Sequence, residues 1–200
     1  MDKFCSQCGA ALTSKFDGGR LRPACSACGH IVYGHYSLGV GGLLLHEGRV
    51  LLIQRAQQPN IHLWTLPGGF VETDETPDEA VLREVLEETG LRTRVLGLLG
   101  SRHWADSEEH SIYYVFGLVL DGPLAELRPD GVETERAEFI SPEAFTDLDV
   151  MGPISRWFCE HFHPEDVALE SLPKEKQPTL RRSDRKMTIY IPRGRSEGIR

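Results

Sequence analysis

The sequence predicts an α/β domain preceded by a small cysteine-rich module. Three observations support this: two Cys-x-x-Cys pairs near the start, one well-capped helix, and strand-like runs on both sides of that helix. The chain has 200 residues, of which 40% are hydrophobic and 26% charged. It is long enough for one globular domain of ordinary size and a second, small module. We expect the module at 1–34, the main domain at 35–165 and a basic tail at 166–200.

Charge and hydropathy narrow the class of protein. The net charge of −8 argues against broad binding of nucleic acid, which depends on Lys and Arg. The charge is distributed unevenly along the chain, because residues 172–200 contain nine Lys and Arg but three Asp and Glu. No apolar run approaches the roughly 20 residues of a membrane span, and the start MDKFCSQCGA lacks the apolar segment of a signal peptide. We therefore expect a cytoplasmic protein with no membrane partner.

Four of the five cysteines form two pairs separated by sixteen residues: Cys5 and Cys8, then Cys25 and Cys28. This spacing is typical of a structural zinc site. Gly9 and Gly29 follow the pairs and suit tight turns that expose backbone N–H groups to the thiolates. Two disulfides in a secreted domain are the alternative, which the missing signal peptide disfavours. Four thiolates complete a tetrahedron, so we expect a structural Zn²⁺ that stabilises a zinc ribbon.

Six strand-like runs are expected in the main domain, at 38–45, 49–54, 63–66, 94–100, 111–120 and 132–140. His46-Glu47-Gly48 is expected to form a turn that joins the first two strands as a hairpin. The glycines at 39, 41 and 42 resemble a phosphate loop, but no Lys-Ser/Thr follows. This favours a thinned strand, meaning a strand in which glycines take the place of residues with side chains. A short helix is expected from Ser141 and another at 154–161, in which Cys159 is a buried or inert thiol.

The basic tail contains one strand-like piece, MTIYIP at 187–192. This piece could add to a sheet, pair with a partner subunit or stay loose. For the basic stretch before it, a disordered tail and a flap facing an anion are the alternatives.

The central helix is expected over 77–89. Thr76 is the N-cap, Glu79 completes a capping box and Gly90 provides the left-handed exit. At about 100° per residue, one face carries Ala80 and the carboxylates of Glu84, Glu87 and Glu88. The opposite face is apolar: Val81, Leu82, Val85 and Leu86.

The acidic face of this helix has two interpretations. A solvated face is the simpler one, although like charges four residues apart destabilise a helix. The other interpretation is a metal-binding face, and the segment before the helix favours it. Leu66-Pro67-Gly68-Gly69 is a turn that lets backbone approach a ligand, and Glu72, Asp74 and Glu75 add acidic groups. Carboxylates that converge from a loop and a helix suit a hard cation such as Mg²⁺.

The stretch resembles the signature of the Nudix hydrolases, whose fixed positions are all filled here: Gly69, Glu75, Arg83, Glu84, Glu87, Glu88, Gly90 and apolar residues at 85 and 91. The resemblance extends more loosely over about 38–145. It implies an α/β/α sandwich with a mixed sheet and metal-dependent hydrolysis of a pyrophosphate bond in a nucleoside diphosphate linked to another group.

The resemblance also implies roles for single residues. Glu84, Glu87 and Glu88 would bind Mg²⁺ or Mn²⁺ together with the Gly68 carbonyl, Arg83 would orient them, and Glu75 would support the set. For a general base from a later loop we favour Glu133, with Glu135 and Glu109 as competitors. Trp104, Phe70, Trp64 and Tyr113 are the aromatic residues available to stack on a base, although each is more often a core residue.

The substrate is expected to be ADP-ribose, NADH or an FAD-like dinucleotide. A zinc ribbon before such a domain resembles the NADH pyrophosphatase group. That group has a Ser-Gln-Pro-Trp-Pro-Phe-Pro motif, of which Ser101 and Trp104 alone remain. An enzyme that removes caps from RNA and a non-catalytic nucleotide-binding module are the alternatives. The related enzymes are often dimers, so a homodimer is an expectation.

Overall fold

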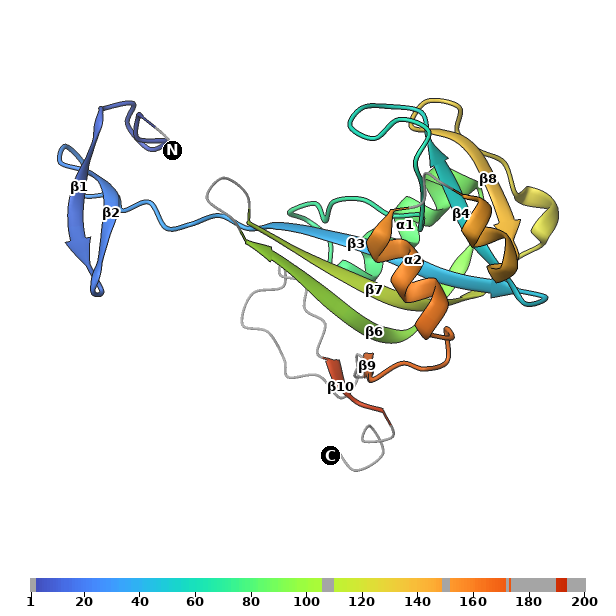
Figure 1. The fold of residues 1–200 in the computed structure, drawn as a ribbon. Coiled ribbons are helices and arrows are strands. Elements are labelled where there is room, and N and C mark those ends of the chain that lie inside the picture. Colours follow the sequence, from blue (N-terminus) through green and yellow to red (C-terminus); the bar gives the residue numbers. More distant parts are fainter. Residues whose placement is uncertain (1–2, 106–109, 149–151, 172, 174–189, 194–200) are drawn as a thin grey trace. The chain divides into compact units, whose positions relative to one another are not determined.

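The computed structural model describes residues 3–105, 110–148, 152–171, 173 and 190–193. The chain divides into two compact units, Met1–Tyr36 and Ser37–Arg200. Both are drawn in Figure 1.

The first unit is a hairpin flanked by two cysteine loops. Strand β1 (Leu12–Asp17) pairs antiparallel with β2 (Arg20–Cys25). In the loops, the Gly9 N–H donates to the Cys5 carbonyl and the Gly29 N–H to the Cys25 carbonyl. Both glycines have positive φ, 72° and 78°, which favours glycine. The predicted tight turns are confirmed.

The second unit is a mixed sheet with helices. Its strands are β3 (Ser37–His46), β4 (Arg49–Arg55), β5 (Trp64–Thr65), β6 (Thr93–Ala105), β7 (His110–Leu120), β8 (Thr134–Ile140), β9 (Leu169–Ser171) and β10 (Tyr190–Pro192). The order is β10-β9-β6-β7-β3-β4-β5, with β8 also paired to β4. Strands β3 and β7 are parallel, whereas the other pairs are antiparallel. The predicted mixed sheet is confirmed.

Two α-helices pack on opposite faces of this sheet, α1 (Pro77–Thr89) and α2 (Pro153–His161). Side chains alternate along β3, so Val40 and Leu44 join one apolar cluster while Leu43 joins the other. The first cluster contains Val81 and Val85 of α1, and the second contains Phe158 and Cys159 of α2. Figure 1 shows the two helices on either side of the sheet. Short 3₁₀ helices cover Leu124–Glu126 and Pro142–Asp147.

Helix α1 has the predicted ends. The Glu79 carboxylate accepts a bond from the Thr76 N–H at 3.0 Å, and Gly90 has φ of 72°. The predicted apolar face is wrong in part, because Leu86 is 46% exposed while Glu88 is 6% exposed. The reason is that the helix turns its small residue Ala80 and the Glu88 carboxylate towards the sheet.

The glycines of β3 make room for a tyrosine of β7. A Cβ at Gly41 would lie 2.2 Å from the Tyr113 hydroxyl, and one at Gly39 would lie 2.9 Å from its ring. The predicted thinned strand is therefore correct: the missing side chains leave space for the Tyr113 ring against the sheet.

The end of the chain adds to the sheet where it is described. Strand β10 pairs antiparallel with β9, which pairs with β6 through Leu169 and Leu98. Of the alternatives for the strand-like piece, addition to a sheet is thus the one observed for Tyr190–Pro192. The basic stretch at 174–186 and residues 187–189 lie outside the described residues.

Candidate active site

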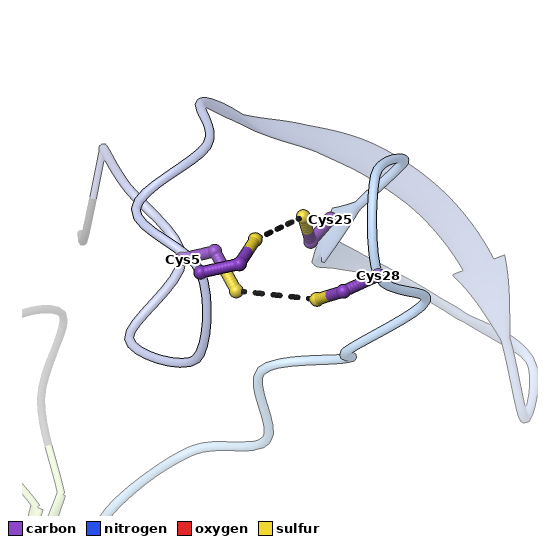
Figure 2. A group of neighbouring side chains, drawn as sticks. Cys5, Cys25 and Cys28 are labelled. Atoms are coloured by element: carbon purple, nitrogen blue, oxygen red, sulfur yellow. Dashed lines mark hydrogen bonds between the residues drawn. The ribbon is translucent and has the colours of Figure 1, made fainter.

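The four paired cysteines lie together in the first unit. Their sulfur atoms lie within 4.8 Å of one another. The Cys5 and Cys28 sulfurs are 3.6 Å apart and those of Cys8 and Cys25 are 3.5 Å apart. Figure 2 shows Cys25 and Cys28 facing the sulfurs of the opposite loop. All four are free thiols rather than disulfides.

This geometry fits zinc. Four sulfurs at about 2.3 Å from a tetrahedral ion are roughly 3.8 Å apart, close to the distances observed here. Backbone N–H groups face the sulfurs, as expected for thiolates: the N–H of Gln7 lies 3.4 Å from the Cys5 sulfur. The N–H of Cys28 is the main cause that lowers the pKa of Cys25 to about 7. The cluster is suited to a closed, structural zinc site.

In the second unit, Arg83 of α1 gathers three carboxylates. Its Nε and Nη2 donate to both oxygens of Glu75, at 3.0 and 2.6 Å. Its Nη1 donates to Glu84 at 2.8 Å and to Glu87 at 3.0 Å. Nη2 also reaches the carbonyl of Phe70 at 3.1 Å. The guanidinium lowers the pKa of Glu75, since its hydrogen bonds favour the carboxylate. Arg83 thereby ties the loop before α1 to the acidic face of the helix.

Glu88 lies deeper than its neighbours. One of its oxygens accepts a hydrogen bond from the Gly68 N–H at 2.8 Å. Burial raises the pKa of Glu88 to about 8, and burial also raises the pKa of Glu84. The pKa values are raised because burial keeps the carboxylate charge away from water. A cation beside Glu84 and Glu88 would stabilise their charged forms and so counteract this effect.

Arg83 and the three helix carboxylates line a cavity of about 880 Å³, here called the acidic cavity. Six carboxylates line it: Glu72, Glu84, Glu87, Glu88, Asp130 and Glu133. Arg55 and Arg83 are its two basic residues. Such an excess of oxygen donors suits a divalent cation.

The carboxylates do not all converge on one point. Glu84 and Glu87 turn to Arg83, whereas Glu88 turns to Gly68. Among the described residues, the four cysteines are accordingly the one group of three or more His, Cys, Asp or Glu side chains whose ligand atoms all lie within 4.8 Å of one another. A metal in the acidic cavity would thus have to compete with Arg83 for two carboxylates.

Glu133 and Asp130 come from the loop before β8. Asp130 was not predicted from the sequence, although Asp130-Gly131 is a recognisable turn signal. Although partial burial opposes it, hydrogen bonds from the N–H groups of Thr134, Val132 and Glu133 hold the pKa of Asp130 below its usual range. Its role is therefore to shape the loop that presents Glu133 to the cavity.

Of the two competitors of Glu133, the structure describes Glu135. Glu135 pairs with His62 at 2.9 Å and does not line the acidic cavity. Glu109 lies outside the described residues.

Three of the four predicted aromatic residues lie in different environments. Phe70 is 66% exposed and lines the acidic cavity. Trp104, near the end of β6, is exposed and lines neither this cavity nor the one beside it. Trp64 is 4% exposed in the core, with the Arg136 guanidinium 5.2 Å from its ring centre. Trp64 lines neither of these two cavities.

A second cavity of about 560 Å³, here called the side cavity, adjoins the first. The two share Arg55, Pro59, Gly68, Gly69 and Phe70 as walls. Tyr113, one of the predicted aromatics, lines the side cavity together with Arg102. Arg55 and Arg102 were not predicted from the sequence, because their strands bring them to the cavities only once the sheet has formed.

Two family models match this chain. The NUDIX domain family model matches residues 35–161, and a zinc-ribbon model described as Nudix N-terminal matches residues 3–34. The chain belongs to the Nudix family. The expected fold and enzyme class, a Nudix pyrophosphohydrolase with an N-terminal zinc ribbon, are thereby confirmed.

Two curated relatives of the Nudix chain are informative. It is 42% identical over 133 residues to an ADP-ribose pyrophosphatase from Methanocaldococcus jannaschii, covering 63% of this chain and 77% of that protein. It is 31% identical over 159 residues to the NAD-capped RNA hydrolase NudC from Chromobacterium violaceum, covering 80% of this chain. The chain spans 57% of the length of that second relative.

Among solved structures, a NUDIX hydrolase from Nitrosomonas europaea aligns with a TM-score of 0.69 and 28% identity, covering 82% of this chain and 95% of that one. No helix in the described part of the Nudix chain has the length and apolar character needed to cross a membrane.

Proposed function

We propose that this protein hydrolyses the pyrophosphate bond of ADP-ribose or a related dinucleotide, using Mg²⁺ or Mn²⁺ in the acidic cavity. The observation that carries the proposal is the convergence of Glu75, Glu84 and Glu87 on Arg83 beside the buried Glu88. The 42% identical relative named an ADP-ribose pyrophosphatase supports the substrate class.

Glu84, Glu87 and Glu88 would hold the catalytic metal, with the Gly68 carbonyl beside them. A divalent ion in this position supplies Lewis acidity towards phosphate oxygens and lowers the pKa of bound water. The oxygen-rich donor set fits such a hard cation. The cysteine cluster would instead hold Zn²⁺ for stability alone, because four sulfurs leave no open position.

Within the acidic cavity the chain's own groups have separate tasks. Glu133 would accept the proton of the attacking water, since it lines the cavity and is not engaged as Glu135 is. Arg83 and Glu75 would keep the helix carboxylates oriented. Arg55, on the wall shared by both cavities, would face the phosphates of the substrate.

The test is a screen of ADP-ribose, NADH and FAD with Mg²⁺ or Mn²⁺, followed by product analysis in isotopically labelled water. Expected products from ADP-ribose are AMP and ribose 5-phosphate, with the label in one of the two. If none of these compounds is cleaved with either metal, the proposal is wrong.

Hydrolysis of a nucleotide cap on RNA is the second candidate. It is supported by the 31% identity to the NAD-capped RNA hydrolase, an alignment that covers 80% of this chain. An RNA carrying an NAD cap, compared with free NAD at equal concentration, distinguishes the two candidates. A strong preference for the RNA, weakened steeply by added salt, would favour cap removal.

We also propose a cytoplasmic homodimer, as the resemblance to related enzymes suggests. Light scattering of the purified protein measures the mass of the particle in solution, and a monomeric mass would contradict the dimer.

A further inference from the structure

The first turn of α2 completes the sheet edge at β5. This strand is two residues long, stands last in the strand order and pairs with β4 on one side. On its other edge, the Gly152 N–H donates to the Trp64 carbonyl at 2.9 Å, and the Leu66 N–H donates to the Ser155 hydroxyl at 3.2 Å. An edge strand leaves its outer N–H and C=O groups without strand partners. Helix α2 therefore supplies the partners that a further strand would have supplied.

Ser155 is the side chain of α2 that makes this contact. It is 5% exposed, and its hydroxyl also lies 2.8 Å from the hydroxyl of Thr65. Leu66 is 1% exposed, so its N–H depends on the Ser155 oxygen for an acceptor. Leaving a buried N–H without an acceptor is costly. Ser155 therefore fixes the backbone at the end of β5.

The end of β5 leads directly into the glycine turn of the acidic cavity. Pro67 stands between Leu66 and Gly68 and has a fixed φ, so the orientation of the Leu66 peptide is passed on with little freedom. The Pro67 carbonyl accepts the N–H of Gly42 in β3 at 2.9 Å. The Gly68 N–H then donates to the Glu88 carboxylate at 2.8 Å. A shift of Leu66 would move the Gly68 N–H away from Glu88.

These contacts link α2 to the proposed metal site. Ser155 lines the side cavity and is absent from the walls of the acidic cavity, so it would act there through the backbone. We propose that Ser155 is a positioning residue for the hydrolysis: through Leu66 it holds Gly68 in the place from which its N–H orients Glu88. This inference rests on the proposed function, in which Glu88 and the Gly68 carbonyl hold the catalytic metal.

The first test needs no catalytic metal. Hydrogen exchange of single amides is followed by NMR in the full chain, without added Mg²⁺ or Mn²⁺. In Ser155→Ala, the amides of Leu66 and Gly68 should both exchange about tenfold faster relative to the amide of Leu52 in the buried strand β4. Faster exchange at Leu66 alone would show a purely local bond and would overturn the inference.

The second test measures the metal and the reaction. Calorimetric titration of the protein with Mn²⁺ should give a dissociation constant about three- to tenfold higher in Ser155→Ala. In turnover of ADP-ribose at saturating Mn²⁺, kcat should fall about tenfold while KM changes by less than about twofold, because the groups that would bind the substrate are unchanged. Ser155→Cys keeps most of the side-chain volume with a weak acceptor and should give the same shifts even if Ser155→Ala does not fold.

Cys159→Ala is the matched control. Cys159 lies one turn further along α2, is 8% exposed and belongs to the apolar core. Its loss should lower the melting temperature through packing and leave Gly68 exchange, Mn²⁺ affinity and kcat unchanged.

The outcomes separate this inference from the proposed function. If the Ser155 variants lose stability as Cys159→Ala does but keep normal Gly68 exchange and Mn²⁺ affinity, the inference is wrong and the function stands. A rise in KM with kcat unchanged would also overturn it, because that result indicates contact with the substrate. If exchange and Mn²⁺ affinity shift as expected but the wild-type protein cleaves no dinucleotide, the proposed function fails and the positioning of Gly68 by Ser155 stands.

Discussion

The backbone N–H of Gly68 donates to the Glu88 carboxylate across 2.8 Å. This bond joins the glycine turn after β5 to the acidic face of α1, twenty residues further along the chain. It draws a carboxylate into the protein, where burial raises its pKa to about 8. The turn and the helix therefore act as one unit, and changes on either side of the bond should affect the same site.

Replacing the buried carboxylate tests the site directly. Glu88→Gln keeps an oxygen that can accept the Gly68 N–H and removes the charge, so the fold should persist with an unchanged melting temperature. Turnover of ADP-ribose with saturating Mg²⁺ should fall by about 10²–10⁴-fold, the range found when a group essential to the chemistry is lost. Glu160→Gln, on the exposed side of α2, is the matched control. Activity near that of the wild type would refute the assignment of Glu88.

The turn itself should not accept a side chain. A Cβ at Gly68 would lie 2.0 Å from the Val40 carbonyl oxygen, and the residue has φ of 153°. Gly68→Ala should lower the free energy of unfolding by about 1–3 kcal/mol, as expected for overpacking. Gly122→Ala is the control, since its nearest contact would be an ordinary 3.5 Å. Denaturant titrations measure both, and equal stability of the two variants would contradict the packing described.

Arg83 cannot be replaced by another cation. Arg83→Lys keeps the charge but cannot reach both oxygens of Glu75 while contacting Glu84 and Glu87. We expect a loss of about 1–3 kcal/mol in the free energy of unfolding. The Mg²⁺ concentration for half-maximal activity should rise as well. Arg94→Lys should change neither quantity, and an Arg83→Lys enzyme with normal metal dependence would argue against an orienting role.

The pairing of Glu75 with Arg83 predicts a pH dependence of stability. The hydrogen bonds from Arg83 lower the pKa of Glu75 from its ordinary value of 4.5, so the folded state binds the proton less tightly than the unfolded state. The stabilisation is thus complete above pH 4.5 and disappears as the pH falls through the lower folded value. Wild type and Glu75→Gln should differ most at neutral pH and converge in acid. A difference that grows on acidification would contradict the pairing.

The cysteine cluster predicts metal-dependent folding of the first unit. Wild-type protein should contain about one zinc ion per chain, and Cys5→Ser with Cys25→Ser should contain none. Mass spectrometry under native conditions measures the content. The second unit should keep its own melting transition, because its core contains none of these cysteines. Unchanged zinc content in the double variant would refute the ribbon.

The acidic site shows where sequence patterns suffice. The helix over 77–89, its caps and the spacing of its carboxylates were predicted because they depend on neighbours one or two turns away. The burial of Glu88 and the exposure of Leu86 were not predicted. Both depend on which face of α1 meets β3, and that contact is made only in the folded domain.

The chemical groups available to this chain can be recognised from the order of its residues: four thiols at zinc spacing, and acidic groups on one helix beside a glycine turn. These are properties of residues close together along the chain, so local geometry decides them. Which of these groups line a common cavity depends on how the chain folds. Arg102 and Tyr113 reach the side cavity through strand pairing, and Glu133 reaches the acidic cavity through a loop shaped by Asp130. Such encounters depend on the packing of distant segments, which no local pattern records.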